Sequence, residues 1–326
     1  MSLRYSLCNA FVAIFIGLAV WGAPLIMDGD HYAWPLKHDL SYTQSYQEFL
    51  YHSLELFVLN FIPPSVRFQF IQILFVFGLF LVALRIGKFG FLIFFSILFI
   101  SPVFNNVRQG GATILFLLLI SWNVKSIVLF FLPTGFHFSA IWFPFYKIFE
   151  RVISDRFYTR PSKAFLFVFL FFVIIFFIAI VFTSYSSFIG VVFSEGRAGW
   201  IQRNLSGSLA VISAWLALLQ CIYIKHGWVV GIDKNRCLVC VDDLVGLCYL
   251  CLGSFLCAIL FGNLYSSSEI FSRFFAFGNL ILPFVLLSCF SKTQSPLCII
   301  LFIFSSITQN QFWIGVSALY SSALFK

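Results

Sequence analysis

Uninterrupted apolar runs recur along this chain, and they constrain its fold more than any other feature. The segment 164–183 reads AFLFVFLFFVIIFFIAIVFT, and runs of similar character are spread over the whole sequence. A run of about 17 to 25 apolar residues is long enough to cross a hydrocarbon core of roughly 30 Å as a helix. Lipid offers the backbone no hydrogen-bond partners, so such runs must be helical. The sequence therefore predicts an all-α polytopic integral membrane protein.

The composition agrees with a membrane protein and argues against other classes. Hydrophobic residues make up 61% and charged residues 10% of the 326 positions, whereas a soluble domain carries about 25% charged residues. The strands of a membrane β-barrel alternate polar and apolar residues, and these runs do not alternate. The net charge of +8 is explained by the accumulation of Lys and Arg in cytoplasmic loops, so no nucleic-acid partner is expected.

The apolar runs predict a single transmembrane domain over residues 1–326, with about 11 to 12 spans and short fold-back helices. Residues 1–26 are interpreted as a retained first span, because their apolar stretch exceeds the roughly 7 to 15 residues of a signal-peptide core. The segment 49–62, which Pro63-Pro64 ends, is too short to cross and is expected at the membrane interface. The spans are predicted near residues 7–26, 66–84, 89–104, 110–122, 126–146, 164–183, 205–224, 244–261, 274–290, 296–309 and 312–325.

The distribution of Lys and Arg predicts on which side each loop lies. A single crossing over 126–146 would place the basic loop that follows it opposite Lys125, against this rule. Two short helices that reverse near His137 remove the conflict, and Pro133-Thr134-Gly135 provides a break. Because irregular backbone at membrane depth needs protein or a cavity around it, Gly135 and His137 are expected to line a cavity. Both termini are then cytoplasmic, with outer loops at 27–52, 184–204 and 262–273 and cytoplasmic loops at 147–163 and 225–243.

Arginines on the predicted outer side oppose the charge rule and need another explanation. A single arginine there could reach lipid phosphates or pair with a nearby Glu195 or Glu269. Several together favour an anionic ligand, because guanidinium groups bind phosphate oxygens in pairs and stay charged. A lipid pyrophosphate is a ligand of this kind. The arginines stand at the ends of hydrophobic segments: Arg108, Arg197, Arg203 and Arg273.

Two further segments carry groups that could exchange protons. His137 lies in apolar sequence and is either a hydrogen-bonded core residue or a general base or phosphate ligand facing the predicted cavity. The first outer loop contains Asp28 and Asp30 beside aromatic residues, which fits either a base with sugar-stacking rings or a solvated turn. The chemical base is accordingly left open between Asp30 and His137.

The sequence predicts no metal and no cofactor. Asp28 and Asp30 lack the remaining pattern of a calcium loop. Cys237-x-x-Cys240 and Cys248-x-x-Cys251 are too close together for the usual zinc spacing, and the second pair falls within a predicted span. No cysteine is placed in an outer loop, so a disulfide framework is not indicated.

Several short motifs, taken in order, resemble the EpsG-like family, which is grouped with the Wzy-type polymerases of bacterial O-antigen and exopolysaccharide synthesis. In hydropathy the likeness covers most of the chain. The sequence departs from the family pattern at Gly110-Gly111, directly after Arg108-Gln109, and at Phe274. The motifs that carry the resemblance are Asp28-x-Asp30-x-Tyr32, Arg108-Gln109, Phe136-His137-Phe138-Ser139-Ala140 and Glu269-x-x-x-Arg273.

This resemblance implies a polymerase with the GT-C-like glycosyltransferase architecture in the bacterial inner membrane. It would join oligosaccharide repeat units carried on undecaprenyl pyrophosphate at the periplasmic face. Arg108 and His137 would be the family's central polar pair, and Asp30 with Tyr32 its first-loop motif. The expected catalytic residues are Asp30, His137 and Arg108, and the expected substrate-binding residues are Arg197, Arg203, Arg273, Glu195, Asp28, Tyr32, Gln109 and Trp200.

Two other functions remain open from the sequence. One is a flippase that moves the lipid-linked oligosaccharide, although transporters carry polar residues near the midplane and here they gather toward one face. The other is a membrane acyltransferase that modifies surface glycans. The expected partners are the undecaprenyl-pyrophosphate-linked oligosaccharide, membrane lipids and a chain-length regulator protein.

Overall fold

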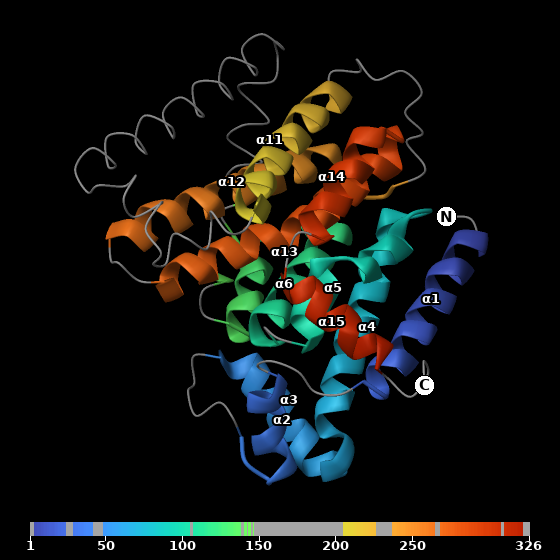
Figure 1. Ribbon diagram of the computed structural model, residues 1–326, viewed down its shortest axis with the longest axis vertical. Helices are drawn as coiled ribbons and strands as arrows, with labels where there is room; N and C mark the ends of the chain where they lie inside the picture. Colours follow the sequence, from blue (N-terminus) through green and yellow to red (C-terminus); the bar gives the residue numbers. More distant parts are fainter. Residues whose placement is uncertain are drawn as a thin grey trace.

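The computed structural model describes most of the chain, and every regular element in the described part is a helix (Figure 1). This confirms the predicted all-α class. The predicted span 164–183 and the predicted loops 147–163 and 184–204 lie outside the described residues. The described residues are 3–23, 29–41, 48–104, 107–137, 140–141, 143–144, 146, 205–225, 237–264, 268–307 and 310–321.

Within the described residues, three helical segments are long and apolar enough to cross a membrane, which agrees with the predicted membrane class. The last of them is the most enclosed, since 89% of it is buried inside the protein. The three segments are Arg4–Trp21 in α1 (Leu3–Trp21), Pro64–Ile86 in the 3-10 turn η2 (Pro64–Val66) and α4 (Arg67–Ile86), and Phe275–Thr293 in α13 (Ser268–Thr293).

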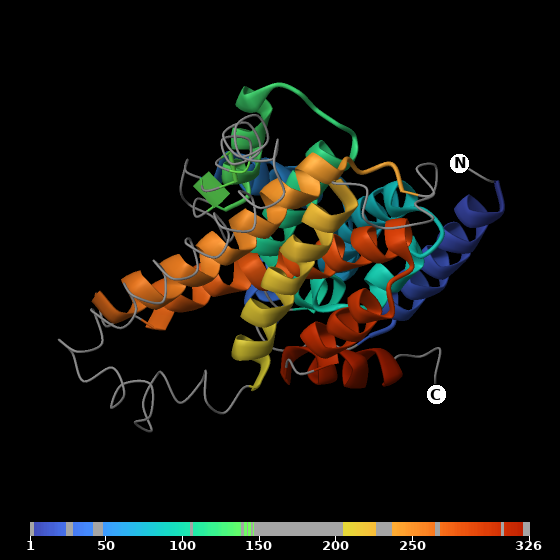
Figure 2. The same cartoon turned by 90° about the horizontal axis from the view of Figure 1, so that it is seen from above.

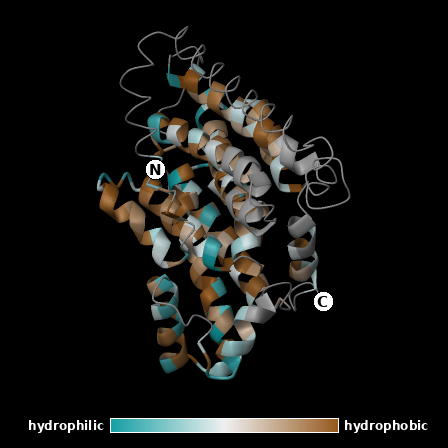
Figure 3. Cartoon of the chain, turned by 90° about the vertical axis from the view of Figure 1, so that its left-hand side faces the viewer, coloured by the Kyte–Doolittle hydropathy of each residue, from teal (hydrophilic) through white to brown (hydrophobic). Residues whose placement is uncertain are grey.

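A small layer of two helices lies beside the start of α4, at the lower end of the molecule in Figure 1. It consists of α2 (Gly29–Lys37) and α3 (Phe49–Phe61), and we call it the α2–α3 layer. The 13 residues of α3 extend for roughly 20 Å, too short to cross, as the sequence predicted for 49–62. Helix α2 forms inside the predicted outer loop. Figure 3 shows hydrophilic positions among the hydrophobic ones in this layer.

The predicted span 89–104 is wrong as a single crossing helix. It divides at Ser96, which has an extended backbone, into the 3-10 helix η3 (Gly90–Phe95) and α5 (Ile97–Phe104). The Ser96 hydroxyl donates to the Ile93 carbonyl at 2.6 Å and so stabilises the break. Ser96 and all the side chains of α5 are buried, so the break itself lies inside protein, as a membrane interior requires.

The chain reverses direction in the segment where the sequence predicted a fold-back. Helix α6 (Val107–Ser121) is followed by the 3-10 helix η4 (Ile127–Gly135). The ring of Phe130, in η4, lies 4.8 Å from the ring of Tyr146, and both rings pack edge-on against Phe116 of α6. Residues on either side of His137 therefore lie side by side. The sidedness of the flanking lysines stays a prediction.

Three of the remaining described helices form a bundle around α13. Figure 2 shows α12 and α13 lying along each other, with α11 beside them and α1 on the far side of the molecule. The thiol of Cys221, on α11, lies 3.3 Å from that of Cys289, on α13, and both are buried. The bundle helices are α11 (Leu205–Lys225), α12 (Val241–Leu264) and α14 (Pro296–Ile307). The last helix, α15 (Asn310–Tyr320), packs against α5 and α14.

Basic side chains gather where α4, α6 and α13 end. Arg85 of α4 donates to the Ser121 carbonyl at the end of α6 (2.7 Å), so α4 and α6 run in the same direction. Lys292, at the end of α13, donates to the Cys237 carbonyl at 3.1 Å. The Leu238 N–H, next to it, donates to the carbonyl of Arg85. We call this region, with Arg85, Lys88, Lys225 and Lys292, the basic end. The α2–α3 layer lies at the opposite ends of α4 and α6.

Candidate functional site

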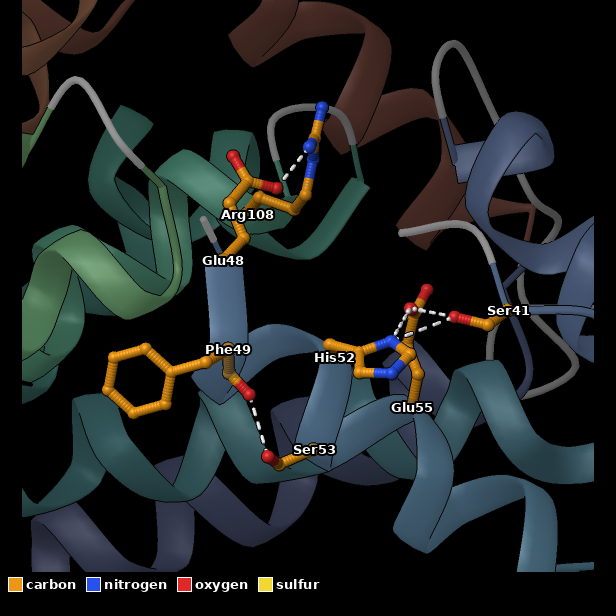
Figure 4. Close-up of polar contacts among 7 residues, drawn as sticks. All are labelled: Ser41, Glu48, Phe49, His52, Ser53, Glu55 and Arg108. Carbon is orange, nitrogen blue, oxygen red and sulfur yellow. Dashed lines mark hydrogen bonds and ion pairs between the residues drawn. The ribbon is translucent and has the colours of Figure 1, made fainter. Parts of the chain in front are cut away.

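Three segments far apart in the sequence meet at the guanidinium of Arg108. Arg108 lies in the first turn of α6, and its Nη1 donates to the Glu48 carboxylate at the start of α3 (Figure 4). Its Nε donates to the hydroxyl of Tyr32, on α2, at 3.3 Å. The guanidinium carbon also lies 5.8 Å from the centre of the Tyr32 ring. One cation therefore joins α2, α3 and α6.

The ion pair is largely enclosed but still reached by solvent on one side. The side chain of Glu48 is 9% exposed and that of Arg108 is 23% exposed. Glu48 stands at the N-cap of α3, yet its carboxylate makes no capping hydrogen bond and is directed to Arg108 instead. Removing two charges from water costs free energy that their attraction repays only in part. A pair of this kind is weak evidence for stability and suits a binding site.

Tyr51 adds a buried hydroxyl beside the ion pair. The residue is fully buried, and its ring lies edge-on to that of Tyr32 at 6.1 Å. Its hydroxyl has no hydrogen-bond partner in the described part of the chain. Burial, followed by the charges of Glu55 and Tyr32, raises the pKa of Tyr51 well above its usual value. The phenol therefore stays neutral and keeps its proton to donate.

A second polar cluster occupies the next turn of α3. Ser41 donates to the Glu55 carboxylate at 2.8 Å, and its Oγ lies 3.2 Å from Nδ1 of His52 (Figure 4). The Glu55 side chain is fully buried, whereas that of His52 is 36% exposed. Ser41 and His52 thus hold Glu55 at the other end of the face that carries Tyr51.

Close backbone approaches position both partners of the ion pair. A Cβ on Gly135, in η4, would lie 2.8 Å from Leu50 and Phe49, so η4 packs directly against the first turn of α3. A Cβ on Gly111 would lie 2.9 Å from Phe136 and Phe75, and one on Gly110 would overlap Pro102. Gly110-Gly111, where the sequence departs from the EpsG-like pattern, therefore allows α6 to approach α5 closely just after Arg108.

The structure brings two of the predicted site residues, Tyr32 and Arg108, into contact. Gln109 follows Arg108 and is buried, with its backbone carbonyl accepting from Thr113 at 2.9 Å. His137 is partly buried, and its ring lies edge-on to Phe277 of α13 at 6.4 Å.

The remaining predicted site residues are not described as side chains. Asp30 lies in α2, two residues before Tyr32, and Arg273 lies in α13, but only their backbone is described. The predicted convergence of several arginines on one pocket therefore stays a prediction. The residues wholly outside the described part are Asp28, Glu195, Arg197, Trp200 and Arg203.

Sequence reasoning did not single out Glu48, Tyr51 or Glu55. Residues three and four apart share one face of a helix, and these three are spaced in that way along an otherwise apolar segment. An acidic and aromatic face on a helix too short to cross the membrane was a signal available in the sequence. The ion-pair partner of Glu48 could not be predicted from the sequence, because Arg108 is 60 residues away along the chain.

Comparisons with protein-family models, with curated proteins and with solved structures find no match for this chain. The resemblance to the EpsG-like family therefore still rests on the sequence motifs. Of these motifs, the structure supplies a geometric relation for the first and second, which meet at the hydrogen bond between Tyr32 and Arg108. In the described part of the chain, no group of three His, Cys, Asp or Glu side chains is placed to hold a metal ion.

Proposed function

We propose that this chain is a polysaccharide polymerase of the bacterial inner membrane, similar to the EpsG-like and Wzy-type polymerases and GT-C-like in architecture. It joins oligosaccharide repeat units carried on undecaprenyl pyrophosphate. The observation that carries the proposal is the meeting of α2, α3 and α6 at Arg108, where a cation, a carboxylate and two tyrosines lie together. This set provides the groups that a glycosyl transfer from a pyrophosphate donor requires.

The chemistry requires positive charge at the leaving group and a base at the acceptor. An acceptor hydroxyl attacks the anomeric carbon of the donor sugar while the bond from that carbon to the pyrophosphate oxygen breaks. Arg108 binds the pyrophosphate as negative charge develops on it, because a guanidinium matches phosphate oxygens and stays charged. Tyr32 supports the guanidinium from α2. The remaining predicted substrate-binding residues would extend this site toward the sugars.

The charge distribution supports a periplasmic position for this site. Lys and Arg are enriched on the cytoplasmic side of inner-membrane proteins, and the basic end lies at the opposite ends of α4 and α6 from the α2–α3 layer. With the basic end in the cytoplasm, Arg108 faces the periplasm. Lipid-linked repeat units reach a polymerase from that side.

The test is to incubate the purified full-length protein in lipid vesicles with lipid-linked oligosaccharide extracted from source cells that lack this gene. We expect longer glycans on the lipid carrier and release of undecaprenyl pyrophosphate in equal amounts. Transfer of acyl groups to the glycan would instead show an acyltransferase. Movement of the intact lipid across the vesicle membrane, without elongation, would show a flippase.

A further inference from the structure

We infer that Glu48 is the group that accepts the proton of the acceptor hydroxyl, and that binding of the donor's pyrophosphate to Arg108 releases Glu48 for this role. The inference rests on the proposed function and assigns the base that the sequence left open between Asp30 and His137. Its structural basis is the ion pair that now joins Glu48 to the cation the donor needs.

Two of the contacts of Arg108, those with Glu48 and Tyr32, can be exchanged, and this makes the release of Glu48 possible. Its contacts with Glu48 and Tyr32 are made by side chains, which can rotate without moving a helix. A diphosphate offers several charged oxygens to the same guanidinium, and such pairs form two parallel hydrogen bonds. The anionic donor therefore competes directly with the carboxylate of Glu48.

The position of Glu48 suits a base better than that of Glu55, the other buried carboxylate on α3. Glu55 is fully buried and accepts a hydrogen bond from Ser41 at 2.8 Å. Glu48 is 9% exposed and shares the partly exposed side of the site with Arg108. The two carboxylates are turned apart, with Glu48 toward α6 (Figure 4). Of these two carboxylates, Glu48 is the one that pairs with Arg108, the cation that would hold the donor.

The step is balanced without any further reactant. The acceptor oxygen forms a bond to the anomeric carbon, and the bond from that carbon to the pyrophosphate oxygen breaks. The electron pair of the broken bond goes to the pyrophosphate, which Arg108 holds. The hydroxyl proton goes to the carboxylate of Glu48 and then to water through the exposed side of the site. Arg108 and Glu48 pair again when the pyrophosphate lipid leaves.

The experiment compares Glu48→Gln with the wild-type protein in two assays. One measures binding of undecaprenyl pyrophosphate, without sugar, to the protein in nanodiscs. The other measures turnover with the extracted lipid-linked oligosaccharide. We expect Glu48→Gln to bind at least as tightly as wild type, because a competing anion is gone, and to turn over about 10² to 10⁴ times more slowly.

A matched control removes the carboxylate of another ion pair in the same layer. Asp39 pairs with Arg67 at 2.6 Å, and its side chain is 74% exposed. Its backbone has a φ of 58°, which asparagine tolerates well. Asp39→Asn should therefore leave both binding and turnover within about twofold of wild type.

The outcomes separate this inference from the proposed function. If the wild-type protein lengthens no glycan, the proposed function is wrong. The replacement of Glu48 by pyrophosphate at Arg108 is then tested by the binding assay alone. Weaker binding of undecaprenyl pyrophosphate by Glu48→Gln than by wild type would overturn that replacement. If the wild-type protein does lengthen glycans, normal turnover by Glu48→Gln overturns the inference, because the carboxylate is then not needed. Parallel losses of binding and turnover also overturn it, because Glu48 then only positions Arg108. If Glu48→Gln does not fold, Glu48→Asp replaces it: unchanged binding with slower turnover supports the inference, and wild-type turnover overturns it.

Discussion

Arg67 and Arg108 each lie in the first turn of a buried helix beside the α2–α3 layer, yet their surroundings differ in kind. Arg67 donates to the carbonyls of Leu36, Leu59 and Ile62 at 2.6 to 3.0 Å and pairs with Asp39, and its side chain is 6% exposed. Arg108 is bound by the side chains of Glu48 and Tyr32 and is 23% exposed.

The difference shows how to distinguish a structural arginine from one available to a ligand. Backbone carbonyls cannot leave Arg67 unless the chain itself moves, so its guanidinium fastens α2 and α3 to the start of α4. Side-chain partners can leave Arg108 by rotamer changes alone, provided that another anion replaces the carboxylate of Glu48 at the guanidinium. On the periplasmic side proposed for this layer, both arginines oppose the charge rule. Of the two, Arg108 is the one whose ion pair and tyrosine contact are made by side chains that a ligand can replace.

The largest expected effect separates the two arginines by the same conservative change. Arg108→Lys keeps a charge that can pair with Glu48 but loses the planar fork that grips two phosphate oxygens. We expect turnover of the lipid-linked oligosaccharide to fall on the order of 10² to 10³. The thermal midpoint in detergent should hardly change. Turnover within threefold of wild type would show that the guanidinium of Arg108 does not stabilise the transition state.

Arg67→Lys should show the opposite pattern. A lysine ammonium cannot reach three carbonyls and Asp39 from one position, so at least one buried acceptor loses its partner. We expect the free energy of unfolding to fall by about 2 to 3 kcal/mol, measured by thermal or denaturant unfolding in detergent. Turnover per folded molecule should stay close to wild type. Equal stability in the two lysine variants would contradict the division of roles.

Gly135→Ala tests whether η4 holds Glu48 in place through the first turn of α3. Its Cβ would lie 2.8 Å from the side chains of Leu50 and Phe49, so these side chains in the first turn of α3 must shift. We expect a loss of about 1 to 3 kcal/mol in unfolding free energy and slower turnover. Gly253→Ala in α12 is the control: nothing lies within 4 Å of its Cβ, and a helix-interior alanine should stabilise by about 0.5 to 1 kcal/mol.

The smallest expected effect concerns the hydroxyl of Tyr51. It is buried without a partner in the described part of the chain, and an unsatisfied buried donor costs roughly 1 to 3 kcal/mol. Tyr51→Phe should therefore raise the unfolding free energy by about 1 kcal/mol in detergent without ligand. A decrease would mean that the hydroxyl makes a hydrogen bond in the folded protein.

The sequence predicted the features that depend on composition and length alone. An all-α membrane protein follows from apolar runs that no water-soluble surface can accommodate. The short segment 49–62 also follows from counting, because Pro63-Pro64 ends it before it can cross. The long runs 7–26 and 66–84 coincide with candidate spans in α1 and α4.

Other features depend on contacts between distant segments and could not be read from the chain. The residues of 89–104 are apolar apart from Ser96 and Ser101, so their pattern cannot distinguish one helix from η3 and α5. The break at Ser96 becomes evident only with its hydrogen bond to Ile93. The pairing of Glu48 with Arg108 likewise requires the packing of α3 against η4 and of α6 against α5.

The basic end carries a native reporter of membrane sidedness. Cys240 is exposed beside Cys237, whose carbonyl accepts from Lys292, while six of the eight cysteines with described side chains are buried. Cys8 is also exposed but lies on α1, where lipid would shield it from a polar reagent. A membrane-impermeant maleimide should thus label Cys240 in inverted vesicles and spare it in intact cells, with Cys240→Ser as the blank. Labelling of Cys240 in intact cells would indicate the opposite orientation in the bilayer, with Arg108 on the cytoplasmic side.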